Sequence, residues 1–189
     1  MQKLFLIRHG KPAAVWGEAD EDPGLDDAGR AQAEAARDFL LSLPEDQRPL
    51  RVVSSPLRRC RETAAPIAEA LGVEIEIDPG VGEIPTPRAL TAEARPAWLR
   101  EAFHGRWAEI QGDLDYEDWR RRAAASLLPR GRTAVFSHYV AINAVMSLLA
   151  EDDRVLVFRP DHASITTLAN DGGSLILVEA GREASTGVL

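Results

Sequence analysis

Short runs of β-branched and other apolar residues alternate along this chain with longer segments rich in alanine and leucine. The short runs have the length of strands, and the longer segments repeat their apolar residues with the helical period. Strands that alternate with helices in this way form a mostly parallel sheet covered on both faces. We therefore predict an α/β fold, a three-layer α/β/α sandwich around a mostly parallel, doubly wound sheet.

Seven segments have the composition of strands, and the last two are separated by the hairpin signal Asn170-Asp171-Gly172-Gly173. The predicted strands are residues 3–7, 51–54, 73–77, 133–136, 154–158, 164–168 and 175–178. One helix is predicted to begin near Asp26, whose carboxylate can cap it, and to run to residue 41. Two more are predicted over residues 57–71 and 139–149.

The strand signal disappears between Pro79 and Pro129, where further prolines interrupt segments of helical composition around residues 97–107 and 115–128. We interpret residues 79–129 as a lid-like helical insertion over one edge of the sheet, within a single domain that spans residues 1–189. Its aromatic residues and one histidine fit two interpretations, an apolar lid over a substrate or ordinary helix packing. They are Trp98, Phe103, His104, Trp107, Tyr116 and Trp119.

Charge and cysteine content limit the partners and the compartment. Thirty acidic against twenty-two basic residues give a net charge of −8, which disfavours nonspecific binding to nucleic acid or to an anionic membrane surface. No apolar stretch approaches the ~20 residues of a membrane-spanning helix. The single cysteine, Cys60, cannot form an internal disulfide, and we predict a cytoplasmic protein. Whether it is a monomer or a homodimer stays open.

Three predicted strands end in residues that suit an anionic ligand. The first runs into Arg8-His9-Gly10, the second is followed by Arg58, Arg59 and Arg61, and the fourth ends at Ser137-His138. Ligands of open α/β sheets bind at the carboxyl ends of the strands, and the helix amides that follow favour anions. Successive helical residues diverge by ~100°, so that only one or two of the arginines can face a shared site.

In order and spacing these segments resemble the histidine phosphatases, the superfamily that includes the cofactor-dependent phosphoglycerate mutases. Arg8-His9-Gly10 is similar to the family's signature, residues 25–33 resemble its first helix, and residues 55–59 resemble its second arginine motif. Gly82-Glu83-Ile84 occupies the region where the family keeps its acid, and Phe136-Ser137-His138 resembles its second histidine motif. The resemblance covers most of the chain.

The resemblance implies a metal-independent phosphatase, without a cofactor, that hydrolyses a small phosphomonoester. His9 would attack phosphorus and become a phosphohistidine that water discharges. Arg8, Arg59 and His138 would bind the phosphoryl oxygens. Glu83 would protonate the leaving alkoxide and then accept a proton from water, a role that needs a raised pKa. The alternative for Glu83 is a solvent-exposed loop carboxylate.

Four further residues are assigned to substrate binding, namely Gly10, Lys11, Arg58 and Tyr139. Lys11 and Tyr139 depart from the family's pattern, and Lys11 fits equally well as a solvated lysine at a loop tip. No asparagine occurs in residues 13–17, where the family has a phosphate contact, and acidic residues 18–22 follow beside the predicted pocket mouth. His162 is interpreted as a surface or packing histidine, because the histidines show no zinc-ligand spacing with cysteine or carboxylate.

Two other functions stay open on the same residues. One is phosphoryl transfer of the phosphoglycerate mutase type, which requires a closed, strongly basic pocket that retains a bisphosphate. The other is a phospholigand-binding module that has lost turnover, which the departures at Lys11 and Tyr139 make worth testing.

Overall fold

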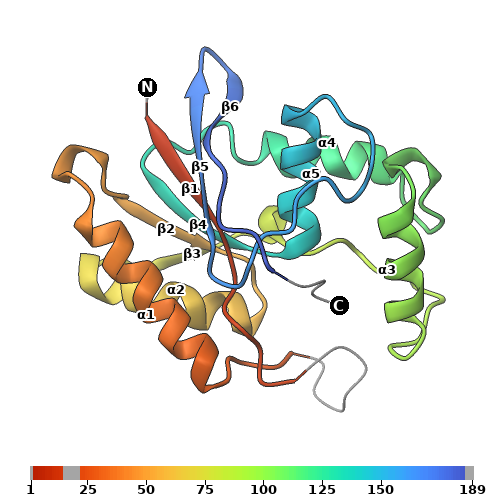
Figure 1. The fold of residues 1–189 in the computed structure, drawn as a ribbon, viewed down its shortest axis with the longest axis horizontal. Helices are drawn as coiled ribbons and strands as arrows, with labels where there is room; N and C mark the ends of the chain where they lie inside the picture. Colours follow the sequence, from red (N-terminus) through yellow and green to blue (C-terminus); the bar gives the residue numbers. More distant parts are fainter. Residues whose placement is uncertain (1, 15–21, 186–189) are drawn as a thin grey trace.

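The computed structural model describes residues 2–14 and 22–185 (Figure 1). In these residues, strands form one sheet in the order β3-β2-β4-β1-β5-β6. The strands are β1 (Lys3–Arg8), β2 (Arg51–Ser54), β3 (Ile75–Ile77), β4 (Thr133–Ser137), β5 (Ile165–Asp171) and β6 (Ser174–Glu179). The first four pair in parallel, whereas β5 is antiparallel to both of its neighbours. The predicted mostly parallel α/β sheet is confirmed.

The centre of the sheet is the parallel pair β1 and β4. Both strands are buried on both faces, which is why they read as continuous apolar runs in the sequence. Their register pairs Ile7 with Phe136 and Arg8 with Ser137. The two strands therefore end at the same level, and the next residues, His9 and His138, emerge side by side.

Helices cover both faces of the sheet (Figure 1). Helices α1 (Asp27–Ser42) and α2 (Arg58–Leu71) pack together on one face, over a core that includes Phe5 and Ile7. Helix α5 (Tyr139–Leu149) lies on the other face, over a core that includes Leu4 and Leu6. Alternate residues of β1 thus enter opposite cores, as the pleat of a strand requires. None of the described helices is long and apolar enough to cross a membrane.

The segment between β3 and β4 contains α3 (Arg95–His104) and α4 (Tyr116–Ala125), with short 3₁₀ turns at Pro79–Val81 and Trp107–Glu109. It packs mainly against α5, and α3 stands outermost in Figure 1. The fully buried Trp107 donates its indole N–H to Ser147 Oγ of α5 at 3.0 Å. Tyr116 is buried in the same cluster. Helix packing is therefore the observed role of these two aromatic residues.

The predicted strand at residues 154–158 is wrong. Apart from an isolated bridge between Arg106 and Arg154, this segment pairs with no strand of the described sheet. The buried Asn143 of α5 supplies the missing partner, because its side-chain oxygen accepts hydrogen bonds from the N–H groups of Val157 and Phe158 at 3.0 and 2.9 Å. A buried side chain thus satisfies backbone groups that a strand would pair in a ladder.

The loop after β1 packs tightly on the first turn of α1. Asp26 caps this helix by accepting the Gly29 N–H at 2.7 Å, as the sequence predicts. A Cβ atom on Gly29 would lie 2.1 Å from the carbonyl oxygen of Lys11, and one on Gly10 would lie 2.6 Å from that of Gly29. The two glycines allow a contact between main chains that no side chain could permit.

Gly29→Ala is expected to lower the free energy of unfolding by about 1–3 kcal/mol, because the added methyl group meets backbone. The sign of this change distinguishes the close contact from helix propensity, because replacing a helical glycine with alanine otherwise raises stability by roughly 1 kcal/mol. Urea denaturation would measure the change. Gly105→Ala is the control, since its new methyl group would have no neighbour closer than 3.4 Å. A Gly29→Ala protein as stable as the wild type would contradict the close contact.

Candidate active site

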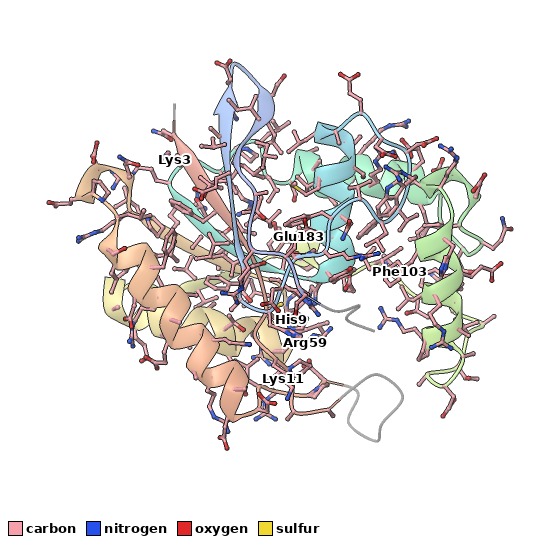
Figure 2. The ribbon with its side chains drawn as sticks, in the orientation of Figure 1. Lys3, His9, Lys11, Arg59, Phe103 and Glu183 are labelled. Atoms are coloured by element: carbon pink, nitrogen blue, oxygen red, sulfur yellow. The ribbon has the colours of Figure 1, made fainter. Side chains whose placement is uncertain are left out.

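Three strand ends meet at one side of the sheet. β1 leads into His9, β4 leads into His138 at the start of α5, and β2 is followed by α2, whose second residue is Arg59. The His9 N–H donates to the Ser137 carbonyl at 3.0 Å, which extends the pairing of β1 and β4 beyond both strands. Figure 2 shows His9 and Arg59 together at this end, with Lys11 beside them and Phe103 approaching from α3.

The His9 ring is held in one tautomer. Its Nδ1 lies 2.8 Å from the Gly10 carbonyl oxygen, and only a protonated nitrogen can donate to a carbonyl. Its Nε2 therefore carries a lone pair and accepts the Arg59 Nε–H at 3.3 Å. Burial, with His138 and the two site arginines nearby, lowers the pKa of His9 well below its usual value. A neutral imidazole with an unprotonated Nε2 is the form that can attack phosphorus.

Arg59 also holds the second histidine. Its Nη2 lies 3.3 Å from His138 Nδ1, which must then be the acceptor, so that His138 Nε2 carries the proton and donates to Ser55 Oγ at 2.8 Å. The fully buried His138 does not line the cavity described below. Burial, with the charge of Arg59, lowers the pKa of His138 well below its usual value. Arg59 thus bonds to both imidazole rings, whose centroids lie 5.3 Å apart.

Arg8 is held by contacts with Pro160 and Tyr139. Its Nη1 donates to the Pro160 carbonyl at 2.9 Å, and its guanidinium carbon lies 4.9 Å from the centroid of the Tyr139 ring. Its buried Nε has no hydrogen-bond partner in the part of the chain that the structure describes. Burial lowers the pKa of Arg8 to about 10, which leaves the group charged near neutral pH. A buried cation with an unused donor suits an anionic ligand.

Glu83 is oriented by the first turn of α5. Its Oε1 accepts the N–H groups of Ile84 and Ala141 at 3.0 and 3.2 Å, and the Val140 N–H lies 3.5 Å from Oε2. These hydrogen bonds favour the ionised form, but burial of the carboxyl group outweighs them and raises the pKa of Glu83. A larger fraction of Glu83 is therefore protonated near neutral pH than of an exposed glutamate.

A cavity of about 380 Å³ opens at this site, within the size range of small-molecule pockets. Helix α3 contributes Pro96, Arg100 and Phe103 to the cavity wall. Spacings of four and three residues place these side chains on one face of the helix. The lining residues are Arg8, His9, Lys11, Pro12, Ala14, Pro23, Arg59, Glu83, Pro96, Arg100, Phe103, Tyr139 and His162. Four of them are cationic and one is acidic, in a chain whose net charge is −8.

Two of the four residues assigned to substrate binding line this cavity, Lys11 and Tyr139. The Lys11 ammonium group forms an ion pair with Asp26 at 2.9 Å, which partly offsets its charge. Tyr139 supports Arg8 with its ring, and the ring of Phe103 lies 5.8 Å from it. The apolar part of the wall is thus built from α3 and α5 together.

The other two assigned residues lie outside the cavity wall. Arg58 is exposed, and its Nε donates to Glu62 Oε1 at 2.7 Å. The rotation of ~100° per residue along a helix turns Arg59 inward and Arg58 away from the site. The N–H of Gly10 donates to Thr63 Oγ1 at 2.9 Å, so this residue contributes a packed turn behind His9.

His162 and Arg100 are cavity residues that the sequence interpretation missed. The sheet topology could have indicated His162 as a cavity residue. His162 lies three residues before β5, and β5 pairs antiparallel with β1. The start of β5 therefore lies beside the carboxyl end of β1. Residues 15–21, which include part of the range without an asparagine and most of the acidic stretch, lie outside the described residues. Among the described residues no cluster of histidine, cysteine and carboxylate side chains could hold a metal ion.

Comparison with known sequences identifies a family. The family model described as the histidine phosphatase superfamily (branch 1) matches residues 4–182. A glucosyl-3-phosphoglycerate phosphatase of Mycolicibacterium vanbaalenii is 31% identical over 128 residues, which cover 60% of this chain and 53% of that protein. The match thus spans about half of this relative's length. A probable phosphoglycerate mutase GpmB of Yersinia enterocolitica is 27% identical over 164 residues, 79% of this chain and 75% of that protein.

Solved structures share the fold. A mycobacterial glucosyl-3-phosphoglycerate phosphatase superposes with a TM-score of 0.72 at 21% identity, covering 97% of this chain and 100% of its own. A phosphoserine phosphatase from Entamoeba histolytica, solved with 3-phosphoglyceric acid, superposes with a TM-score of 0.74 at 22% identity. The match covers 96% of this chain and 98% of that chain. At these identities the likeness establishes the fold.

At pH 6.5, where an ordinary histidine is half protonated, we expect His9 and His138 to be neutral and in opposite tautomers. His9 should carry its proton on Nδ1 and His138 on Nε2, because a carbonyl oxygen accepts from the first and Arg59 donates to Nδ1 of the second. Long-range ¹H–¹⁵N correlation spectra would identify both forms, with His9→Ala and His138→Asn for assignment. An imidazolium at either position, or a His9 proton on Nε2, would contradict the geometry.

Proposed function

The chain belongs to the histidine phosphatase superfamily (branch 1), and we propose that it is a metal-independent phosphatase that hydrolyses a small phosphomonoester through a phosphohistidine on His9. The supporting observation is the tautomer of His9. Its Nδ1–H is committed to the Gly10 carbonyl, which leaves the Nε2 lone pair beside the Arg59 guanidinium in the cavity. We also keep the prediction of a cytoplasmic location.

In the first step, His9 Nε2 attacks phosphorus while the bond to the leaving oxygen breaks. Arg8 and Arg59 offset the negative charge of the phosphoryl oxygens, which is the largest demand of phosphoryl transfer. Glu83, with its raised pKa, gives its proton to the leaving alkoxide. The products of this step are a free alcohol, a phosphohistidine and an ionised Glu83.

In the second step, water attacks the phosphohistidine from the side that the alcohol has left. Glu83 accepts a proton from this water, and the bond between phosphorus and Nε2 breaks. Inorganic phosphate leaves, His9 is again neutral, and Glu83 is again protonated. One carboxyl group thus serves as acid and base in turn, so that the cycle needs no other titrating group.

Phosphoglycerate mutase activity is the second candidate, because probable mutases are among the relatives. We rank hydrolysis first because a mutase must retain a bisphosphate while it reorients, and this chain lacks the asparagine of the family's pattern and has an acidic overall balance. Conversion of one phosphoglycerate isomer into the other, faster than phosphate release, would reverse the ranking. A phospholigand-binding module without turnover would bind phosphate esters and release no phosphate.

His9→Ala is expected to lower the rate of phosphate release by at least about a thousandfold, because it removes the nucleophile. A panel of sugar phosphates, phosphoglycerates, phosphoserine and aryl phosphates would be assayed with the wild-type protein first. Acid-labile phosphoprotein, trapped by rapid denaturation, should form with the wild type alone. A wild-type protein that releases phosphate from no member of the panel and forms no such species would refute the proposal.

Glu83→Gln is expected to slow hydrolysis of alkyl phosphates by about 10²–10⁴-fold, and that of nitrophenyl phosphate much less, because nitrophenolate leaves without a proton. The pH profile gives a second readout. Since the pKa of Glu83 is raised, its acid form survives above the range of an ordinary glutamate and is lost as pH rises through the raised value. The wild-type kcat/KM for alkyl phosphates should fall on this alkaline side, and the Glu83→Gln protein should lack that fall. Equal slowing for both leaving groups would exclude Glu83 as the acid.

A further inference from the structure

The cavity contains a histidine that the proposed mechanism does not use. His162 lines the cavity, and the centroid of its ring lies 6.0 Å from that of His9, with the planes inclined by 52°. Its backbone N–H donates to Asp161 Oδ1 at 2.8 Å. Neither nitrogen of its ring has a hydrogen-bond partner among the residues that the structure describes. The ring is therefore placed beside the nucleophile without a structural bond of its own.

The loop that carries His162 is hydrogen-bonded to His9 and Arg8. The Pro160 carbonyl accepts the Arg8 Nη1–H at 2.9 Å, and the Ala163 N–H donates to the His9 carbonyl at 3.3 Å. These bonds flank His162 on both sides in the sequence. The main chain on both sides of His162 is thus anchored to Arg8 and His9, so the His162 ring is carried on an anchored loop.

The phosphoryl site can accept a further hydrogen-bond donor to a nonbridging oxygen. A phosphoryl group presents three nonbridging oxygens. Of the residues that the family resemblance assigns to these oxygens, Arg8 and Arg59 line the cavity, whereas both ring nitrogens of His138 are bonded, to Arg59 and to Ser55. The Lys11 ammonium group is paired with Asp26. Within residues 2–14 and 22–185, His162 is a cavity-lining imidazole whose ring nitrogens have no hydrogen-bond partner.

The charges around His162 suit a neutral donor. Burial and the nearby Arg8 lower its pKa to about 4, against the weaker opposing effect of Asp161 and Asp26. Near pH 7 the ring is therefore uncharged and has one N–H and one lone pair. A neutral donor adds a hydrogen bond without adding repulsion toward Arg8 before the ligand arrives.

We propose that His162 is a phosphate-binding residue that donates a hydrogen bond to a nonbridging oxygen of the phosphoryl group held by Arg8 and Arg59. This inference rests on the proposed function, because it names a further contact in the same site. A centroid distance of 6.0 Å leaves room for a phosphoryl group to contact both rings, since a hydrogen bond spans about 2.8 Å between heavy atoms.

The test compares His162→Ala and His162→Asn with the wild type, and His104→Ala serves as the matched control. His104 is exposed on α3 and lies outside the wall of this cavity. Calorimetric titration with inorganic phosphate gives Kd without requiring turnover, and steady-state kinetics give kcat and KM. Thermal melting of each protein checks that the fold is intact.

We expect His162→Ala to weaken phosphate binding by about tenfold to a hundredfold, the range for one hydrogen bond to a charged group. His162→Asn should recover most of the affinity because its amide also donates, and His104→Ala should match the wild type. Unchanged affinity in His162→Ala, equal losses in the Ala and Asn variants, or no phosphate binding by the wild type would each overturn the inference. A wild type that binds phosphate without hydrolysing esters would refute the proposed function and leave this contact supported by the titration.

Discussion

The parallel pairing of β1 with β4 is the constraint on which the rest of the site depends. Both strands are buried on both faces, so a shift of one residue would move every side chain into the wrong core. The register that results ends both strands at Arg8 and Ser137 and brings His9 next to His138. Arg59, from the first turn of α2, bonds to both rings. His9 thus owes its position to hydrophobic packing of the strands that precede the two histidines.

The electrostatics of the site follow from the burial of two arginines beside two histidines and a glutamate. Arg8 and Arg59 are withdrawn from water, and Arg8 keeps an unbonded Nε in the described structure. Burial of the rings, with the charges of these arginines, lowers the pKa values of His9 and His138, whereas burial raises the pKa of Glu83. The two imidazoles are therefore held neutral, and a larger fraction of Glu83 is protonated than of an exposed glutamate. Four cationic side chains and one carboxylate line the cavity, in a chain whose net charge is −8.

The cavity wall comes from different parts of the chain. The end of β1 and the first turns of α2 and α5 supply one part, whereas the segment between β3 and β4 supplies Glu83 and, from α3, Pro96, Arg100 and Phe103. That segment packs on α5 through its own core. The cavity face of α3 can therefore vary without disturbing the sheet.

The sequence by itself determined the sheet, the order of its elements and the residues at the strand ends, because apolar runs, caps and breakers are local signals. It predicted Arg8, His9, Arg59 and Glu83 as residues of one site, and in the structure these four line one cavity. Only the tertiary structure decided that Arg59 bonds to both histidines and that Arg58 points away. It also decided that residues 154–158 bond to Asn143 instead of forming a strand, and that His162 lines the cavity. Each of these depends on helix phase or on contacts between segments distant in the chain. Such contacts are set by packing, on which no local pattern reports.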